Sequence, residues 1–402
     1  MTNCLIIGKV WPEPTSTAAG RRTYDVITAL QLGCWQIHFA SAAQRGDHAL
    51  DLEAIGVRTH KITVNDAAFD PWVEALAPQV VIFDRFMTEE QFGWRVAQHC
   101  PEALRVLDTS DLHCLRFARE QAFKSGEALN LKNEIALREI AAIYRSDLTL
   151  MISEFEIEIL RDEFGISENL LAYWPFFLEL SNGRVLFENR KDFILIGSFL
   201  HPPNLDAARW CKAKIWPLIR QQLPEAELHC YGSYSDRYAA ELHAPKNGFH
   251  FKGRAEDALA TMSRYRVNLA PLRYGAGLKG KVFDGFQTGT PTIMTPIAAE
   301  GICMNLDWGH TAAEDFATAA LQLYREPDAW RIRQCEERSL CRDRFNSTDW
   351  LSRLVTIIQC VIGERFQRRE QNFIGQMLRH HQHRSTEFMS RWIEYKNKQH
   401  KR

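Results

Sequence analysis

The chain has 402 residues, 46% of them apolar, which predicts two or three domains with sizeable cores. Its 49 Lys and Arg nearly balance its 50 Asp and Glu, so net charge favours neither nucleic acid nor a membrane as a partner. Ten cysteines without a C-x-x-C pair suit reduced thiols in a cytosolic protein and argue against a zinc site. The first apolar run is too short for a signal peptide, and no run long enough to span a membrane follows. We therefore expect a cytoplasmic protein.

Short apolar runs alternate with longer helical patterns along the chain. Strands are predicted at Cys4–Val10, Gln36–Ala40, Val80–Asp84, Leu104–Leu107, Leu148–Ile152, Phe193–Gly197, Glu227–Tyr231, Phe249–Lys252, Val267–Leu272 and Thr292–Thr295. Helices are predicted at Gly20–Leu32, Glu127–Tyr144, Pro203–Gln222 and Lys279–Thr288. Nearly continuous apolar strands separated by helices are typical of parallel sheets buried on both faces, so the fold class is α/β and doubly wound.

The strand–helix alternation restarts at Phe193, after a polar stretch that includes Asn182-Gly183-Arg184. We therefore predict two Rossmann-like domains, 1–174 and 175–345, followed by a helical extension at 346–402. Ligands of open α/β sheets bind at the carboxyl ends of the strands, so two such edges facing each other would hold two substrates in one cleft.

The C-terminal segment from Gly363 to Arg402 has ten Lys and Arg and four Asp and Glu, a local charge of 10 − 4 = +6. Phe373, Met377, Phe388 and Trp392 recur there at helical spacing. One interpretation is helices that pack on the body or on a second chain. The alternative is a basic amphipathic segment on an anionic membrane, at the inner face of the cell membrane.

The most informative segment is the glycine-rich turn Arg273-Tyr-Gly275-Ala-Gly277-Leu-Lys279-Gly-Lys281, between a predicted strand and a predicted helix. Free N–H groups at the start of a helix attract anions, and glycines let the backbone approach them closely. With Arg273, Lys279 and Lys281 nearby, the turn is predicted to bind a diphosphate. Asp284, three residues further on, either accepts hydrogen bonds from the ribose of a nucleotide or is a solvated helix residue.

Two other motifs nearly match the same turn. Gly275-x-Gly277-x-x-Gly280 fits the dinucleotide fingerprint, although it occurs late in the chain rather than at the first βα turn. Gly275-x4-Gly280-Lys281 begins a Walker A motif, but Val282 stands where Ser or Thr should bind magnesium. All three interpretations share phosphate binding and differ in the ligand.

Further motifs follow in the second half: Gly197-Ser-Phe-Leu-His-Pro-Pro-Asn204, Ile215-Trp-Pro217, Phe249-His-Phe-Lys-Gly253, Gly289-Thr-Pro291 and Ala299-Glu-Gly301. Together with the glycine turn, they make residues 148–345 resemble retaining family 4 glycosyltransferases (glycosyl transferases group 1), which have the GT-B fold. The N-terminal half resembles the family more weakly, at Pro12–Gly20 and Leu107–His113.

The resemblance implies roles for individual residues. Lys279 and Arg273 would hold the donor diphosphate, and Gly275 and Gly277 would offer backbone N–H groups. Asp284 falls on the ribose-binding second Glu of the family's E-x7-E motif, whereas Ala276 replaces the first Glu. Gly253 and Arg254 match the loop beside the nucleobase.

The remaining implied residues surround the phosphates and the transferred sugar. His201 and Asn204 would approach the phosphates, and Gly20 would belong to a glycine loop. Arg21 and Arg22 follow that loop. One of them would reach the diphosphate or an anionic acceptor; the alternative is that both are surface arginines. His113 would lie near the transferred sugar, or it would be structural.

The resemblance also implies a reaction. A sugar would move from a nucleotide sugar to an acceptor hydroxyl, on a glycan or a lipid-linked molecule, with retention. The chain has no D-x-D motif, so we predict transfer without a metal and with no cofactor beyond the donor substrate. The expected pathway is glycan, lipopolysaccharide or exopolysaccharide synthesis. The alternative, suggested by Ala276, is a catalytically degenerate nucleotide-binding or scaffold protein.

Overall fold

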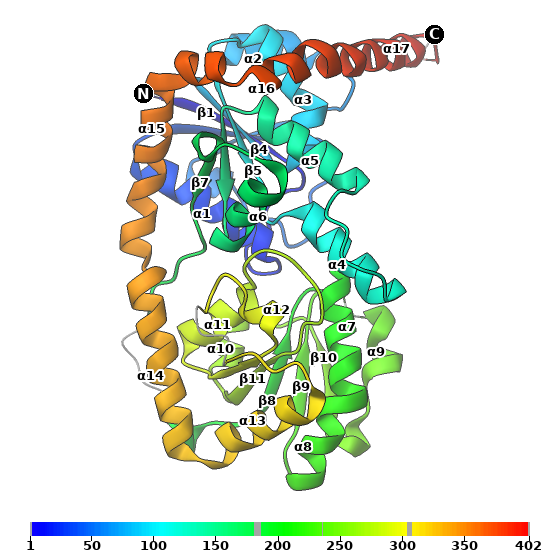
Figure 1. Cartoon of the computed structure of the whole chain (residues 1–402), viewed down its shortest axis with the longest axis vertical. Coiled ribbons are helices and arrows are strands. Elements are labelled where there is room, and N and C mark those ends of the chain that lie inside the picture. The colour runs from blue at the N-terminus through cyan, green and yellow to red at the C-terminus, as the bar shows by residue number, and fades with distance from the viewer. Residues whose placement is uncertain (1, 181–185, 235, 304–307, 401–402) are drawn as a thin grey trace.

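A computed structural model describes residues 2–180, 186–234, 236–303 and 308–400 (Figure 1). Two separate parallel sheets follow one another along the long axis of the molecule, each flanked by helices. This arrangement confirms the predicted α/β class with two Rossmann-like domains and a helical C-terminal extension.

The first sheet has seven strands in the order β3-β2-β1-β4-β5-β6-β7, all parallel. They are β1 (Asn3–Gly8), β2 (Gln36–Ser41), β3 (Arg58–Lys61), β4 (Val80–Asp84), β5 (Leu104–Asp108), β6 (Leu148–Met151) and β7 (Leu171–Tyr173). The helices of this half are α1 (Ala18–Leu32), α2 (Phe69–Leu76), α3 (Phe86–His99), α4 (His113–Ser125), α5 (Glu134–Arg145) and α6 (Glu154–Phe164).

The second sheet has five parallel strands in the order β10-β9-β8-β11-β12. They are β8 (Lys191–Ile196), β9 (Leu228–Tyr231), β10 (Phe249–Gly253), β11 (Tyr265–Ala270) and β12 (Thr292–Met294). The helices of this half are α7 (Pro202–Trp210), α8 (Trp216–Gln222), α9 (Asp236–Leu242), α10 (Ala258–Met262), α11 (Gly280–Thr288), α12 (Pro296–Ala299), α13 (Ala313–Arg325) and α14 (Pro327–Arg344).

Both faces of the first sheet are buried. Alternate residues of β1 enter two different cores: Leu5 and Ile7 pack on one side, and Cys4 and Ile6 on the other. Since successive side chains of a strand point to opposite faces, both faces need apolar residues. This explains why the strand appears as a continuous apolar run in the sequence.

One predicted helix begins in the wrong place. The sequence predicts a helix over Glu127–Tyr144, but residues 127–133 are outside the helices α4 and α5. Gly126 ends α4 with a left-handed φ of 75°, and the Asn133 side chain caps α5 by accepting from the Ala136 N–H. Capping residues of this kind fix the ends of helices.

The chain returns to the first domain at its end through α15 (Ser347–Gln371), α16 (Phe373–Leu378) and α17 (Arg384–His400). Leu354 and Ile358 of α15 are buried in the same core as Val26 and Leu30 of α1. The side chain of Asn372, the N-cap of α16, donates to the Tyr144 carbonyl over 2.7 Å, and Ser390 of α17 accepts from Arg95 of α3 over 3.1 Å. These contacts support the interpretation in which the C-terminal helices pack on the body.

Two segments of the chain, one at Leu178 and one at Phe345–Ser347, connect the halves of the molecule and run beside each other. The Leu178 N–H donates to the Phe345 carbonyl over 2.8 Å, and the Ser347 N–H donates to the Leu178 carbonyl over 3.2 Å. We propose that the domains divide as predicted, at 1–174, 175–345 and 346–402, because β7 ends at Tyr173 and β8 begins at Lys191. Asn182–Arg184, on which the prediction partly rested, lie outside the described residues.

No helix in the described ranges combines the length and apolar character that a membrane crossing needs.

Candidate functional site

A cavity of about 760 Å³ opens between the carboxyl ends of the two sheets. Residues that follow strands of both domains line it: Lys9, Arg85 and Ser110 from the first, and Gly197, Gly232 and Leu272 from the second. Two open α/β sheets thus present their ligand-binding edges to one space, as the sequence predicted.

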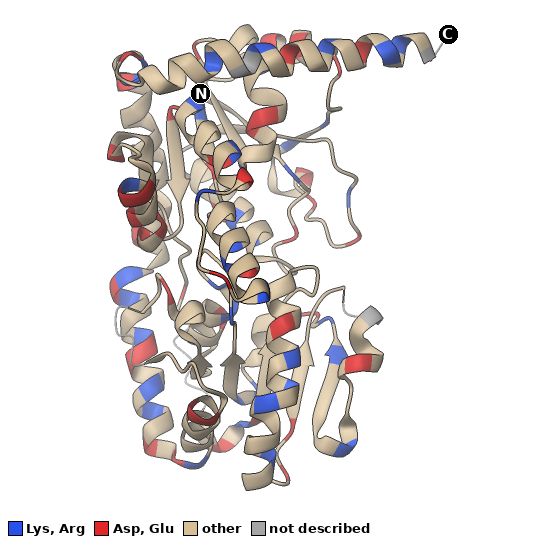
Figure 2. Cartoon of the chain, turned by 45° about the vertical axis from the view of Figure 1, so that its right-hand side comes forward, with Lys and Arg blue, Asp and Glu red and all other residues tan. Residues whose placement is uncertain are grey.

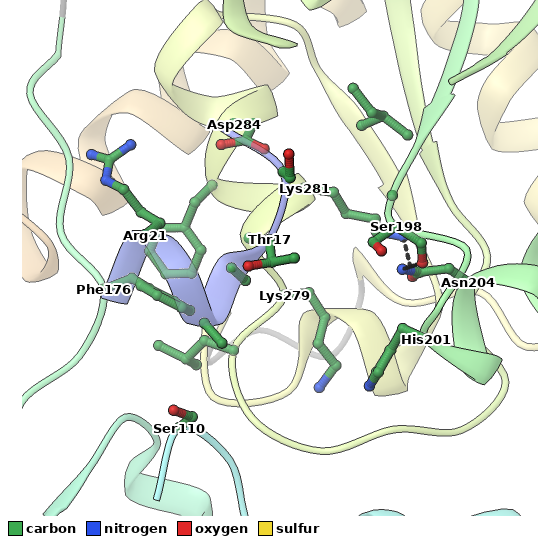
Figure 3. Close-up of a pocket in the computed structure, with 18 of the residues that line it drawn as sticks. Thr17, Arg21, Ser110, Phe176, Ser198, His201, Asn204, Lys279, Lys281 and Asp284 are labelled. Carbon is green, nitrogen blue, oxygen red and sulfur yellow. Dashed lines mark hydrogen bonds between the residues drawn. The ribbon is translucent and has the colours of Figure 1, made fainter. Parts of the chain in front are cut away.

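Lys279 occupies the N-cap position of α11, with its backbone extended and its side chain inside the cavity lining (Figure 3). The residue is 7% exposed, and its ammonium donates to the Gly277 carbonyl. Burial lowers the pKa of Lys279 to about 8, although nearby Glu300 acts in the opposite direction. A buried cation at the N-terminus of a helix is suited to an anionic ligand.

Lys281 is a second cation at the start of α11. Its ammonium donates to the Asn204 side chain over 2.6 Å, and Asn204 in turn donates to the Ser198 carbonyl over 2.8 Å (Figure 3). Burial lowers the pKa of Lys281 to about 8. Asn204 of α7, which is itself held by the loop after β8, therefore fixes the Lys281 side chain at the start of α11.

Asp284 lies one turn further along α11 and also lines the cavity, near Arg21 of α1 (Figure 3). Burial raises the pKa of Asp284 to about 6, while Arg21 and Lys281 lower it. The carboxyl therefore changes its charge in a range where an ordinary aspartate is fully ionised.

Two histidines face the cavity from opposite domains. His201 is the N-cap of α7, and burial followed by the charge of Arg116 lowers its pKa to about 4, so its ring is neutral. His113 is the first residue of α4; its backbone N–H donates to Glu139, and its Nδ1 lies 3.0 Å from the Asp111 carbonyl. The tautomer with Nδ1 protonated suits that carbonyl and leaves Nε2 as an acceptor.

Side chains of the first domain hold the glycine turn of the second. Arg119 of α4 donates to the Gly275 carbonyl over 2.8 Å and to both carboxylate oxygens of Glu300. Glu156 of α6 is buried and accepts from the N–H groups of Gly277 (2.7 Å) and Leu112 (3.0 Å). The turn is thus fixed against the opposite domain rather than free in the cleft.

Six of the predicted site residues line the cavity together: Lys279, His113, Gly275, Asp284, His201 and Asn204. The other five are Arg273, Gly277, Gly20, Gly253 and Arg254, which lie outside this lining.

Arg273 does not line the cavity. Its guanidinium binds both carboxylate oxygens of Asp206, over 2.9 and 2.5 Å, and lies over the ring of Phe123. The Gly277 N–H is used by Glu156, so it is not available to a phosphate, and a Cβ at Gly277 would lie 2.7 Å from Asp111. In this structure both groups are therefore engaged by protein partners.

Gly20, Gly253 and Arg254 also lie outside the lining. Gly20 is inside α1, where a Cβ would come within 2.5 Å of the Glu13 backbone, so its role is helix packing. Arg254 donates to the Thr15 hydroxyl over 3.1 Å, which joins the two domains. The residues that follow, Ala255 to Leu259, line the cavity in their place.

Sequence reasoning missed several lining residues. Ser198 lies two residues after β8, and Thr17 is the N-cap of α1, where its hydroxyl accepts from the Gly20 N–H. Thr followed by a helical pattern is a recognisable N-cap, so Thr17 could have been found in this way. Glu156 is outside the lining but holds the Gly277 N–H, and it gives no comparable local pattern, because Gly277 is 121 residues away.

Comparison with known proteins addresses what such a cleft does. Residues 190–326 match the family model described as Glycosyl transferases group 1. No curated protein sequence matches the chain.

Among solved structures, the chain is similar to a sucrose-phosphate synthase of Thermosynechococcus elongatus, with 12% identity, a TM-score of 0.64, and coverage of 90% of this chain and 100% of that one. It is similar to HepE of Anabaena, solved with UDP and glucose, at 12% identity and a TM-score of 0.67, with coverage of 90% and 100%. TarM of S. aureus, solved with UDP and α-GlcNAc-glycerol, has 12% identity and a TM-score of 0.57, covering 71% of this chain. This chain spans 57% of the length of TarM.

Residues 190–326 thus match the glycosyltransferase group 1 model, and the chain shares the two-domain GT-B fold of the solved glycosyltransferases. The glycosyltransferase interpretation of the glycine turn is therefore favoured over the dinucleotide and P-loop alternatives.

Proposed function

We propose that the chain moves a sugar from a nucleoside-diphosphate sugar to an acceptor hydroxyl with retention and without a metal ion. The observation that carries the proposal is the pair of cations at the N-terminus of α11 in the interdomain cavity, the buried Lys279 and the half-buried Lys281. We place the donor on the second domain and the acceptor between Lys9, Arg85 and His113 of the first. Glycan, lipopolysaccharide or exopolysaccharide synthesis is the proposed pathway, at the cytoplasmic face of the membrane.

The chemistry of the transfer explains the need for these cations. The anomeric C–O bond to phosphate breaks, and negative charge develops on the departing diphosphate. In this proposal, Lys279 and the N–H groups at the start of α11 are oriented toward that charge before the reaction. They therefore stabilise the charge without a free-energy cost of reorganisation. The acceptor oxygen forms the new bond to the anomeric carbon, and its proton passes to the departing phosphate.

The solved relatives make UDP the first nucleotide to test, because HepE and TarM are both recorded with UDP. We expect the wild-type chain to release UDP from a UDP-sugar in the presence of EDTA. A panel of nucleotide sugars, each assayed for released diphosphate with and without Mg²⁺, tests this. A requirement for Mg²⁺ would contradict metal-independent transfer, and failure to bind any nucleoside diphosphate would contradict the whole proposal.

A degenerate nucleotide-binding protein is the second candidate, because Ala276 lines the cavity where the family's first Glu is expected. Such a protein would bind UDP but release none from any donor–acceptor pair in the panel. Calorimetry and the release assay together therefore distinguish the two candidates.

We expect UDP affinity to fall as the pH drops through about 6, because Asp284, with its raised pKa, is then protonated and no longer offers a charged acceptor to the ribose hydroxyls. Asp284→Asn should bind UDP about 10-fold more weakly at pH 7, as expected for lost hydrogen bonds to a charged group. Calorimetry between pH 5 and 7.5 measures both effects.

The pH series has its own control. The terminal phosphate of UDP gains a proton in the same pH range, but it does so equally with the wild type and with Asp284→Asn. The wild type should therefore show the steeper pH dependence. Parallel curves would remove Asp284 from the nucleotide site.

We also propose that α16 and α17 contact an anionic membrane. Their outer surface exposes large apolar side chains: Phe373 (73%), Met377 (46%), Phe388 (67%), Met389 (58%), Trp392 (53%) and Tyr395 (62%). Figure 2 shows Lys and Arg spaced along the same helix, at one end of the molecule. Aromatic and basic residues on one amphipathic surface suit the interface of an anionic bilayer.

We expect Phe388→Ser/Trp392→Ser to lose most of the binding to vesicles with anionic lipid, while the fold is retained because both side chains are exposed. Co-sedimentation with anionic and with neutral vesicles measures this. The matched control is Leu137→Ser, which replaces an exposed apolar residue of α5 outside the C-terminal segment. Equal sedimentation of all three proteins would refute the membrane contact.

A further inference from the structure

We propose that Glu227, His229 and His250 form a binding site for Zn²⁺ or a similar divalent transition metal on the second sheet, separate from the donor cavity. The site was not evident in the sequence, because its ligands come from two strands. None of the three residues lines the interdomain cavity, and the proposed transfer does not use them.

The strand register brings the ligands together. Glu227 directly precedes β9, His229 is the second residue of β9, and His250 is the second residue of β10. His229 and His250 are paired directly across the two parallel strands, so their side chains project from the same face. One ligand atom of each of the three residues lies within 4.8 Å of the others.

The distances suit an ion between these atoms. His250 Nε2 lies 3.4 Å from Glu227 Oε1, yet it is buried without a hydrogen-bond partner. His229 Nε2 lies 2.8 Å from Glu227 Oε2. Tetrahedral ligands at zinc bond lengths of about 2.0 Å are separated by about 3.3 Å. The Glu227 side chain is 41% exposed, so it has room to rotate into the geometry, and water can take the fourth position.

The surroundings of His229 also fit a metal ligand. Its Nδ1 lies 2.6 Å from the Tyr265 hydroxyl, which is itself 3.0 Å from the Tyr231 hydroxyl. A hydrogen bond on one ring nitrogen fixes the tautomer and points the other nitrogen at the ion.

The ligand types select the metal. Two imidazoles and one carboxylate suit Zn²⁺, Cu²⁺ or Ni²⁺, whereas Mg²⁺ and Ca²⁺ prefer oxygen ligands alone. A bound ion would join β9 to the edge strand β10 through side chains. Gly232 and Ala255, which follow these strands, line the donor cavity. The ion would therefore stabilise the edge of the sheet that supports the cavity.

The test is calorimetry of Zn²⁺ binding to the full chain after treatment with a chelator and dialysis. We expect one high-affinity site in the wild type. His229→Ala and His250→Ala should each weaken Zn²⁺ binding by more than about 100-fold, and Tyr265→Phe, which acts through His229, by about 10-fold. Thermal unfolding with and without Zn²⁺ should show a stabilisation that both histidine variants lose.

Two controls address other histidines. His243→Ala replaces a ring whose centroid is 6.0 Å from that of His250 but which is outside the proposed ligand set, and it should keep the affinity. His380→Ala/His381→Ala removes histidines of the C-terminal segment and should also keep it. The inference is wrong if the wild type binds no Zn²⁺, if the His229 and His250 variants bind as the wild type does, or if Mg²⁺ competes equally.

Failure here is distinguishable from failure of the proposed function. The chelated wild type should still bind UDP, because the donor cavity does not include these ligands. Zn²⁺ binding without UDP binding would support the metal site and refute the donor site. UDP binding without Zn²⁺ binding would support the donor site and refute the metal site.

Discussion

Lys279→Ala should weaken UDP binding by about 2–4 kcal/mol, which is a loss of about 30-fold to 1,000-fold in affinity. The reason is that Lys279 is a buried cation at the N-terminus of α11, so no solvent screens its attraction for a diphosphate. Turnover should fall by at least the same factor, because the negative charge on the leaving group increases in the transition state. Calorimetry with UDP and a release assay with the active UDP-sugar measure the two effects.

Arg273→Ala is the matched control for this variant. Both residues belong to the same glycine turn, but Asp206 holds Arg273 outside the cavity lining. We therefore expect Arg273→Ala to bind UDP as tightly as the wild type does. If Arg273→Ala loses affinity and Lys279→Ala retains it, the assignment of the donor diphosphate to the start of α11 is wrong.

Arg22→Ala should lower the free energy of unfolding by about 3–5 kcal/mol, the usual cost of breaking a buried ion pair. Arg22 is 1% exposed, and its Nε donates to both carboxylate oxygens of Asp108 over 2.9 and 3.2 Å. Its guanidinium also donates to the Trp174 carbonyl and lies 4.8 Å from the centre of the Trp174 ring. Removing Arg22 leaves Asp108 buried without its partner. Chemical denaturation at neutral pH measures the loss.

Arg21→Ala provides the comparison, since Arg21 pairs with Asp25 nearer the surface and its side chain is 36% exposed. Its cost in stability should stay below about 1 kcal/mol. The double variant Arg22→Met/Asp108→Leu should recover much of the stability that Arg22→Ala loses, because the uncompensated charge is removed. Equal destabilisation by Arg21→Ala and Arg22→Ala would show that the buried pair is not the cause.

The interior strands of both sheets could be predicted from the sequence, but the two edge strands of the first sheet, β3 and β7, could not. β4 matches the predicted Val80–Asp84, because both faces of the strand are buried and every residue of it is apolar until Asp84. β3 (Arg58–Lys61) is polar and partly exposed at the edge of the sheet, so it carries no apolar pattern. Hydrophobic periodicity in a sequence reflects which residues are buried. A strand with few buried residues has no such periodicity and is therefore not predicted.

The site was predictable where it depends on local chain geometry. A strand, a glycine turn and a helix follow one another in the sequence, and this pattern was enough to predict Lys279 and Asp284 as site residues. The structure places both in the cavity lining. The position of Arg273 outside the lining could not be predicted, because its partner Asp206 is 67 residues away. Likewise, the Gly277 N–H meets Glu156, 121 residues away and in the other domain. Contacts of this kind depend on how the domains meet, which no local motif records.

The two segments that connect the domains constrain how the cleft can open. Since the backbone of Leu178 is hydrogen-bonded to both Phe345 and Ser347, the connections behave as one two-stranded ribbon rather than as independent tethers. A ribbon bends easily about one line and resists twisting or sliding. Admission of substrates and release of products should therefore proceed by a clamshell rotation about an axis through Leu178.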